Sequence, residues 1–431
     1  MMSLLTTLCG VAFVVSLGLI VYHHLLYPKL LELAARELRR TASARALGLD
    51  VQAGELPSVG VIVPCYNEAR YIAGKVRNLC ALDYPPDKLS IVIALDGCTD
   101  DTGRLALQAA QEYAEGRSFS VVSYDANQGK IAVLNDQISA LTCDIVALTD
   151  ASAELAPDAV LRAVAHFRAA DVGVVAATYR LAQAGSEGER AYIGYLTRMR
   201  SDEALLGTPL GVHGALYFFR RVLWRPLPPD TINDDFVMPL QIVEQGYRGV
   251  YDTGIIAVER EKTADDQDFK RRRRLGAGNL QQSLRLWRLY DPHRPLLAWM
   301  FASGKGMRPF IPAFAIVAFV SGLWLAACGS IAAGLIVLVG IAGVEVGRLP
   351  MRTPQYPWPK VLRWLGYLVD GHTASGLGAL DYLMGRRIAG WQPPSTVRPQ
   401  AVIIWSSKAS STPLEPPPAV GELPSTPFTA S

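Results

Sequence analysis

The chain has 431 residues, of which 19% are charged, and its formal net charge is only +3. So small a net charge gives no sign of nucleic-acid binding, and the scattered cysteines and histidines form neither a disulfide framework nor a zinc-binding pattern. A mean hydropathy of +0.19 is high for a soluble enzyme, so this length predicts one large domain together with membrane segments.

The first predicted element is a membrane helix. Residues 4–27 contain no Asp, Glu, Lys or Arg, and a run of this length spans a bilayer. No basic residues precede the run and no cleavage-type site follows it closely, so we expect a permanent anchor. Four basic residues come next and place the following chain in the cytoplasm, on the inner side of the plasma (inner) membrane: Lys29, Arg36, Arg39 and Arg40. Residues 30–47 are typical of a basic amphipathic helix on the inner leaflet.

An α/β domain is predicted next, within residues 58–290. Apolar, β-branched runs predict strands at 59–64, 89–95, 119–124, 145–148 and 172–177. Between them, helices are predicted at 69–82, 101–115, 129–141 and 157–169, and a further helix from 270 to about 290. This alternation favours an α/β fold with a doubly wound, mostly parallel sheet, in which ligands bind at the carboxyl ends of the strands.

Carboxylates and arginines occur at the predicted strand and helix ends. Asp96 and Asp150 each follow a predicted strand, Asp234 and Asp235 precede an apolar helix, and a run of four arginines occupies 271–274. Carboxylates of this kind can hold a divalent cation and a nucleotide, another can accept a proton, and arginines can neutralise phosphate. The set suits transfer of a group from a nucleoside diphosphate donor.

The order and wording of these motifs resemble the membrane-bound family 2 inverting glycosyltransferases. That family includes cellulose, chitin and hyaluronan synthases and many bacterial exopolysaccharide enzymes. The resemblance covers residues 58–282 and is carried by "VGVIVPCYNEARYIAGKVRNL", "NQGKIAVLNDQI", "GVHGALYFFRRVLW", "NDDF" and "RRRRL". It implies the glycosyltransferase A fold. "NDDF" stands where the family usually has Thr-Glu-Asp, and "RRRRL" stands where processive members have Gln-x-x-Arg-Trp.

The resemblance implies a nucleotide-sugar site and a metal ligand. The residues that it assigns to the nucleotide sugar are Pro64, Tyr66, Glu68, Asp96, Lys130, Asp150, Arg271 and Arg274. Asp150 corresponds to the first carboxylate of an Asp-x-Asp motif that binds Mg²⁺ or Mn²⁺. Ser152 stands in the second place, and a neutral hydroxyl is a weaker ligand, so the metal geometry is expected to depend on Asp150, the diphosphate and water. The arginine run also fits a charge at the membrane surface, and both roles are compatible.

The acceptor side is assigned in the same way. Asp235 corresponds to the family's catalytic base, which deprotonates the acceptor hydroxyl, and Asp234 is given a supporting role. His213 and Gly214 fall in the segment that meets the acceptor, although a purely structural role for His213 is an equal alternative. Leu275 replaces the tryptophan that holds the growing polymer in processive members.

The remaining chain predicts a C-terminal membrane region at 291–390. Residues 309–328 and 331–346 are apolar and form two expected spans. Residues 364–384 contain Asp370, His372 and Asp381, which are costly in lipid, so an interfacial or re-entrant helix is favoured over a full span. Residues 391–431 are rich in Pro, Ser and Thr and are typical of a disordered tail.

The sequence therefore predicts an anchor (1–28), an amphipathic helix and linker (29–57), a cytoplasmic glycosyltransferase domain, the membrane region and the tail. The expected activity is metal-dependent, inverting hexosyl transfer from a nucleoside diphosphate sugar, UDP-linked in preference to GDP-linked, to a lipid-linked or growing glycan. Two alternatives are a processive polysaccharide synthase with its own translocation path and a catalytically inactive membrane scaffold. Leu275 and the few C-terminal spans argue against the first, and the intact aspartates argue against the second.

Overall fold

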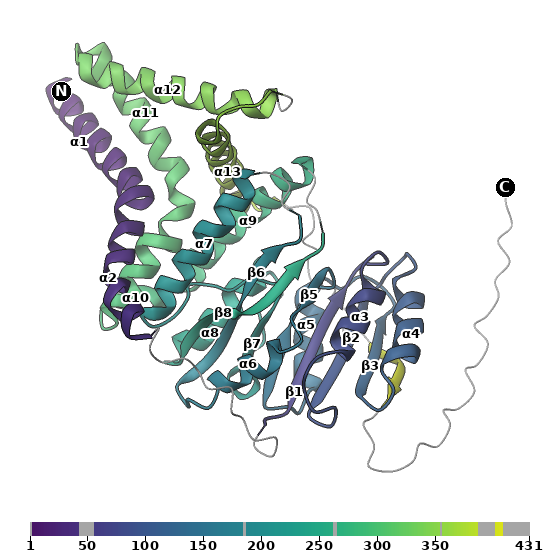
Figure 1. Ribbon diagram of the computed structural model, residues 1–431. Helices are drawn as coiled ribbons and strands as arrows, with labels where there is room; N and C mark the ends of the chain where they lie inside the picture. Colours follow the sequence, from purple (N-terminus) through teal and green to yellow (C-terminus); the bar gives the residue numbers. More distant parts are fainter. Residues whose placement is uncertain are drawn as a thin grey trace, which may run out of the picture.

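A nine-stranded mixed sheet forms the centre of the molecule in the computed structural model, which describes residues 2–42, 56–183, 187–261, 265–353, 356–386 and 401–407 (Figure 1). The strand order is β5-β8-β6-β7-β4-β1-β2-β3-β9. The strands are β1 (Val59–Cys65), β2 (Leu89–Asp96), β3 (Ser118–Tyr124), β4 (Ile145–Leu148), β5 (Ala153–Leu155), β6 (Val172–Leu181), β7 (Tyr217–Arg220), β8 (Arg248–Glu259) and β9 (Ala401–Ser407).

Helices cover both faces of this sheet, because successive strand residues point to opposite sides. Val61 and Val63 of β1 belong to a core shared with α3 (Ile72–Cys80), α4 (Thr102–Tyr113) and α6 (Ala159–His166). Ile62 faces the other way, into a core shared with α5 (Lys130–Ala140) and α8 (Asp234–Glu244). The predicted doubly wound arrangement is confirmed for this part of the chain.

The sheet contains more antiparallel pairing than the sequence predicted. Strands β4, β1, β2 and β3 are parallel, and β6 is parallel to β8. Strand β7 lies between β4 and β6 and is antiparallel to both. Strand β5 is antiparallel to β8. The sequence prediction missed β5, β7 and β8. Strands β5 and β7 are only three and four residues long, and β8 includes the polar residues Arg248, Asp252 and Thr253, so its apolar pattern is interrupted.

One segment of the predicted C-terminal tail belongs to the sheet. Residues 401–407 form β9, which pairs antiparallel with β3, and the ring of Trp405 lies edge-on to Phe119 at 5.8 Å between centroids. The expectation of disorder is therefore wrong for this segment. Its apolar residues cover the edge of β3, which would otherwise leave backbone groups unpaired. The other residues of the predicted tail lie outside the described residues.

Three helical stretches of the described chain are long and apolar enough to cross a membrane, judged by length and composition: Met2–Arg40, Pro295–Ala327 and Ile331–Pro350. They contain α1 (Met2–Val21), α2 (Tyr27–Ala42), α10 (Pro295–Phe301), α11 (Ile311–Ala327) and most of α12 (Ile331–Arg352). Helices α1 and α11 run side by side (Figure 1), and Phe13 packs against Ala318 and Ala333. The three predicted spans thus correspond to three apolar helical stretches.

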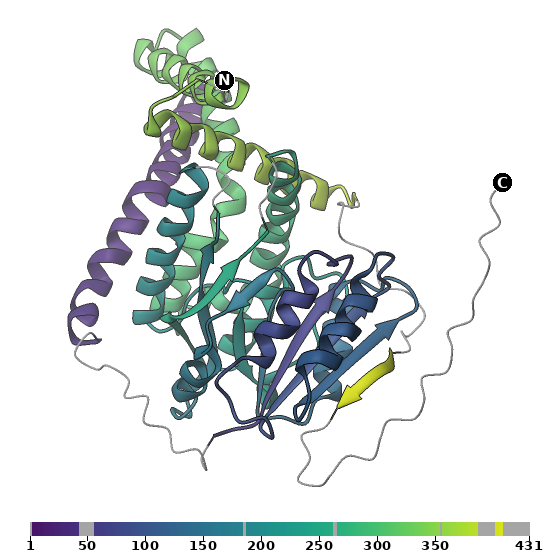
Figure 2. The ribbon, with the colours of Figure 1, turned by 45° about the vertical axis from the view of Figure 1, so that its right-hand side comes forward.

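Two further helices connect these apolar helices to the sheet. Helices α7 (Glu187–Leu205) and α9 (Asp265–Arg285) lie between the sheet and α1 and α11 (Figure 2). Helix α13 (Lys360–Leu383) is not among the apolar stretches and packs along α9. Part of the apolar face of α2 packs on protein as well, because Leu31 and Ala35 are fully buried. Leu30 and Leu33 of the same helix are exposed, and the predicted position of this helix on the inner leaflet stays a prediction.

Candidate active site

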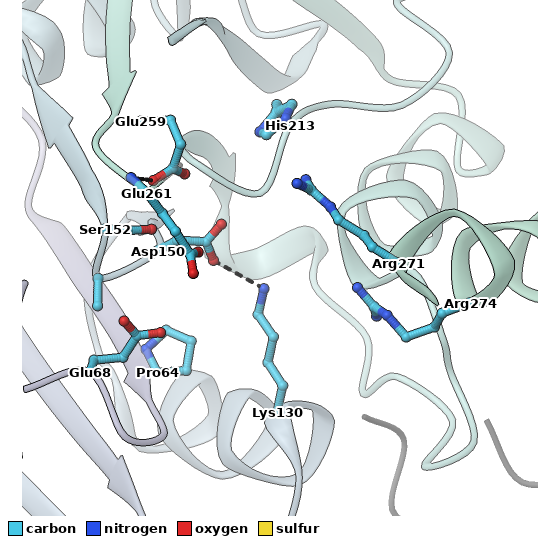
Figure 3. A pocket seen from close by; sticks show the side chains of 11 residues that line it. Pro64, Glu68, Lys130, Asp150, Ser152, His213, Glu259, Glu261, Arg271 and Arg274 are labelled. Atoms are coloured by element: carbon cyan, nitrogen blue, oxygen red, sulfur yellow. Dashed lines mark hydrogen bonds and ion pairs between the residues drawn. The ribbon is translucent and has the colours of Figure 1, made fainter. Parts of the chain in front are cut away.

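A cavity of about 350 Å³ lies at the carboxyl ends of the central strands. Its lining residues are Pro64, Glu68, Lys130, Asp150, Ala151, Ser152, His213, Glu259, Glu261, Arg271 and Arg274. Figure 3 shows the carboxylates along one side, Arg271 and Arg274 across from them, and Lys130 reaching in between. The structure therefore brings most of the predicted nucleotide-sugar residues together, although they come from distant parts of the chain.

Lys130 joins two groups of carboxylates. Its Nζ lies 3.3 Å from Asp150 Oδ1 and 3.3 Å from Asp234 Oδ2. Burial alone would lower the pKa of Lys130, but the negative charges of Asp150, Asp234 and Asp235 outweigh it and raise the pKa. Lys130 is therefore a permanent cation between the turn after β4 and the start of α8.

Asp96 positions Lys130 and does not line the cavity. Its buried carboxylate accepts hydrogen bonds from the backbone N–H groups of Gln128 (2.6 Å) and Gly129 (2.9 Å), just before α5 begins. The predicted contact of Asp96 with the nucleotide stays a prediction. The same holds for Tyr66, which is half exposed and lies outside the set of lining residues.

Asp150 faces several oxygen-bearing side chains. Burial would raise its pKa, but the positive charge and hydrogen bond of Lys130 outweigh burial and lower it, so the group is ionised. The Ser152 hydroxyl hydrogen-bonds the carboxylate of Glu259, which also accepts a hydrogen bond from Glu261 N at 2.9 Å. Burial and the neighbouring carboxylates Glu261 and Asp150 raise the pKa of Glu68 to about 7.

This donor set fits a hard cation only when other ligands complete the shell. Carboxylate and hydroxyl oxygens are the ligands that Mg²⁺ and Mn²⁺ prefer. Within the described part of the chain, however, no group of three or more His, Cys, Asp or Glu side chains is placed to hold a metal ion alone. The predicted sharing of a cation between Asp150, diphosphate oxygens and water stays a prediction.

Three residues near Asp150 were missed by the sequence prediction. Glu259 and Glu261 reach the cavity because β8 pairs with β5, directly after the Asp150 turn. Lys75 on α3 is buried and donates to Thr149 Oγ1 (2.7 Å) and to the carbonyl of Ala153 (2.5 Å), so it braces both ends of that turn. The acidic "VERE" at the end of an apolar run was the available signal for the two glutamates.

Asp235 lies at the first turn of α8, next to Asp234. Burial and the negative charge of Asp234 raise the pKa of Asp235 above the usual range of an aspartate. The backbone carbonyl of Asp235 accepts a hydrogen bond from Val212 N at 3.1 Å, which ties α8 to the loop that carries His213 and Gly214. A raised pKa at a carboxylate suits a group that accepts a proton near neutral pH.

Gly214 and His213 approach the site closely. A Cβ atom built on Gly214 would stand 3.2 Å from Asp150 Oδ2, so a larger residue would press on that carboxylate. His213 stacks on Tyr179 with 3.6 Å between ring centroids, and its Nδ1 accepts a hydrogen bond from Ala215 N at 3.2 Å. Burial lowers the pKa of His213, so the ring is neutral and carries its proton on Nε2.

Two of the four arginines at 271–274 face the cavity, and the other two contact α13. Arg271 and Arg274 line the cavity, as their shared helix face predicted. Arg272 stands 3.6 Å above the centroid of the Tyr367 ring, and Arg273 donates to both oxygens of Asp381 at 2.5 and 2.8 Å. Two arginines therefore serve the cavity and two fasten α9 to α13.

Comparison with known proteins agrees with this arrangement. The model "Glycosyl transferase family 2" matches residues 60–225, and "Glycosyl transferase family group 2" matches residues 145–341. These matches support a family 2 glycosyltransferase. The recognition made from the sequence is thus confirmed, and the cavity lies inside the matched domain.

Individual relatives of this glycosyltransferase are distant. A beta-monoglucosyldiacylglycerol synthase of Nostoc sp. is 29% identical over 199 residues, covering 44% of this chain and 42% of the relative. A poly-beta-1,6-N-acetyl-D-glucosamine synthase of Staphylococcus aureus is 25% identical over 228 residues, covering 50% and 52%. The chain thus spans about half the length of these curated relatives.

A solved structure confirms the glycosyltransferase A fold. The mannosyltransferase of Pyrobaculum calidifontis, described in complex with GDP-Man and Mn²⁺, superposes with a TM-score of 0.66 at 24% identity. It covers 87% of this chain and 100% of its own.

Proposed function

We propose that this glycosyltransferase moves one sugar from a nucleoside diphosphate sugar to a lipid-linked or glycan acceptor, with inversion at the anomeric carbon. The observation that carries the proposal is the meeting of Asp150, Lys130 and the arginines Arg271 and Arg274 around one cavity, with Asp235 beside it. The names of the two curated relatives agree, since one names a glycolipid product and the other a polysaccharide.

The reaction is a single displacement. The acceptor hydroxyl oxygen forms a bond to the anomeric carbon and gives its proton to Asp235. The bond between that carbon and the diphosphate oxygen breaks, and the electron pair leaves with the nucleoside diphosphate. Arg271, Arg274 and Lys130 stabilise the charge that grows on the diphosphate. One displacement inverts the configuration, so no second nucleophile is required.

A divalent cation, Mg²⁺ or Mn²⁺, is part of the proposal. Asp150 would hold it, together with the diphosphate, and the cation would neutralise phosphate charge in the donor complex. Ser152 and Glu259 then have a supporting role, because the serine hydroxyl already bonds the glutamate. Ser152 replaces a second charged ligand, so we expect weaker metal binding than in an Asp-x-Asp site.

The proposed location is the inner membrane, with the catalytic domain in the cytoplasm. Three apolar helical stretches support a membrane protein, and the basic residues that follow the first one favour the cytoplasmic side. Nucleotide sugars would then reach the cavity from the compartment that synthesises them, and the acceptor would arrive from the membrane.

The test is a donor panel assayed with the full-length protein in detergent. UDP- and GDP-sugars are supplied one at a time with Mn²⁺, with Mg²⁺, or with EDTA, and release of the nucleoside diphosphate is measured. We expect release from at least one donor with metal and its loss in EDTA, with UDP-sugars preferred. A wild-type protein that turns over no donor with any membrane extract as acceptor would support the inactive-scaffold alternative.

A further inference from the structure

A group of three cations lies outside the cavity described above. Arg200 belongs to α7, and Lys305 and Arg308 belong to the short turns between α10 and α11. Lys305 and Arg308 fall within Pro295–Ala327, one of the three apolar stretches. A charged side chain in such a stretch is costly, and it usually faces the protein interior and marks a path for a substrate.

The contacts of the three cations turn them inward. Arg308 donates to the hydroxyl of Tyr192 on α7, and Lys305 Nζ stands 5.7 Å from the centroid of the Phe236 ring. Arg200 donates to the carbonyl of Val212 at 3.0 Å, while its Nε is buried and has no hydrogen-bond partner. An unpartnered buried donor on a guanidinium is costly, and it lacks an acceptor that the protein itself supplies.

These contacts place the cations beside the proposed base. Val212, which accepts from Arg200, donates its own N–H to the carbonyl of Asp235. Phe236, which Lys305 approaches, directly follows Asp235. Arg200 and Lys305 therefore lie near the base, and Arg308 contacts Tyr192 of α7, the helix that stands between the sheet and the apolar helices (Figure 2).

Protein carboxylates do not balance this positive charge. Within the described part of the chain, no ion pair within 4.0 Å joins any of the three cations to a carboxylate. Asp202 is paired with Arg39, and Glu203 is buried and accepts a hydrogen bond from Leu210 N at 2.8 Å. Among the described residues, Glu203 and Asp235 are thus the nearby carboxylates not held by another cation, two against three basic groups.

We propose that Arg200, Lys305 and Arg308 bind the phosphate group of a lipid acceptor whose sugar-accepting oxygen lies at Asp235. Arginine matches phosphate oxygens with paired hydrogen bonds, and basic pockets between membrane helices suit lipid headgroups. The site rests on the proposed function, because it assigns the acceptor of that reaction. It narrows the acceptor class from any glycolipid or glycan to a lipid that carries phosphate.

The experiment measures lipid binding without a sugar donor. Full-length protein in phosphatidylcholine nanodiscs is offered two matched pairs, phosphatidic acid against diacylglycerol of the same acyl chains, and an isoprenyl phosphate against the same isoprenol. Binding is read by native mass spectrometry, with inorganic phosphate as competitor. We expect at least one phosphorylated lipid to bind at least about tenfold more tightly than its uncharged partner, the scale of one charged hydrogen bond.

Variants locate the site. Lys305→Gln and Arg308→Gln should each remove most of that preference, and Lys305→Arg should keep it because the charge is retained. The control is Lys29→Gln, since Lys29 is exposed, pairs with Glu32 and is also basic and near the apolar helices. Donor affinity, measured by nucleotide titration, should be unchanged in all of them, because none lines the donor cavity.

Three results would overturn the assignment. If the phosphorylated and uncharged members of both lipid pairs bound equally, the phosphate group would have no part in binding. This result holds for the wild type even if the variants did not fold. If Lys29→Gln lost the preference for the phosphorylated lipid as fully as Lys305→Gln and Arg308→Gln, the preference would come from general surface charge. Inorganic phosphate that displaced the lipid at equal concentration would indicate a free-anion site. If donor turnover still depended on Asp235 in these cases, the proposed function would stand while the lipid phosphate site failed.

Discussion

Lys130 links the donor and acceptor sides of the site through two ion pairs. Asp150 belongs to the donor side and Asp234 precedes the proposed base, and the ammonium group lies 3.3 Å from each. Asp96 accepts hydrogen bonds from the backbone of the turn just before Lys130, so this strand-end aspartate helps to position the lysine. A change at Asp96 would therefore disturb both sides at once.

The raised pKa of Asp235 predicts an acid limb in the pH profile. A general base works only when deprotonated, so kcat/KM should fall as the pH drops below that pKa, which lies above the ordinary aspartate value of about 3.9. Asp234 raises the pKa through its negative charge. Asp234→Asn should therefore move the acid limb to lower pH, which initial rates across a pH series would measure. An unmoved or more alkaline limb would mean that Asp234 does not influence the base.

Adjacent arginines on α9 should differ in what they control. Arg271→Gln should raise the donor KM at least about tenfold, because a hydrogen bond to a charged group contributes roughly 1.5–3 kcal/mol. Arg272→Gln should lower the unfolding temperature, since it loses the Tyr367 ring, and should leave the donor KM near that of the wild type. Steady-state kinetics and thermal unfolding of both variants test this. Equal KM values for the two would contradict the division of the run.

Among individual site residues, the sequence predicted those in local motifs. It missed those that reach the site through contacts between distant parts of the chain. Asp150, Asp235 and Arg274 stand in recognisable segments, so their part in the site could be inferred before the fold was known. Glu259 reaches the cavity only because β8 pairs with β5, and Arg200 meets Asp235 only through Val212. No pattern within a single segment encodes such neighbours.

At the scale of elements, the crossing of α9 and α13 holds the arginines in place. A Cβ atom on Gly276 would lie 2.5 Å from Ser375 Cα, and one on Gly378 would lie 1.9 Å from the carbonyl oxygen of Arg273. Small residues let the two helices approach closely, and the buried Asp381 pairs with Arg273 across the contact. Helix α13 therefore acts on the cavity through α9 without lining it.

Gly276→Ala should separate these helices. The added methyl group has no space, so we expect a loss of about 1–3 kcal/mol of stability together with a higher donor KM as Arg271 and Arg274 shift. Gly340→Ala on α12 is the matched control, because nothing lies within 4 Å of its Cβ position. Thermal unfolding and donor titration of the two proteins compare them. A Gly276→Ala protein as stable and active as the control would show that the contact is not tight.

The same distinction holds for helices and strands: those with a clear local pattern were predicted, and those that depend on pairing with a distant segment were missed. The strands β1, β2, β3, β4 and β6 consist mainly of apolar residues and were predicted to within a few residues. Strand β9 was missed because its segment lies in a Pro- and Ser-rich region, and its partner β3 is far away in the chain. The charges in 364–384 indicated that α13 is no ordinary span, and the Asp381 pair with α9 supplies a physical reason.

At the scale of the molecule, the catalytic domain stands against its apolar helices through α7 and α9 (Figure 2). The described chain has three apolar helical stretches, and we expect a wide polymer channel to need more. Leu275 also replaces the tryptophan that processive relatives use, and a leucine offers apolar contact without an aromatic face for a sugar.

Products should therefore be short. Purified protein given excess labelled donor should add one or a few sugars to each acceptor before release, because Leu275 offers the product no aromatic face. Sizing the products by gel electrophoresis and mass spectrometry at early times measures this. High-mass polymer formed while most acceptor is untouched would favour the processive synthase instead.

The most direct test of the central claim compares the wild type with Asp235→Asn. Both proteins receive the best donor of the panel with metal and membrane extract, and both release of nucleoside diphosphate and donor affinity are measured. The asparagine variant should bind donor as the wild type does and should lose at least about 10²-fold in turnover, the scale of a missing general base. Turnover in the variant close to that of the wild type would contradict single-displacement glycosyl transfer with Asp235 as its base.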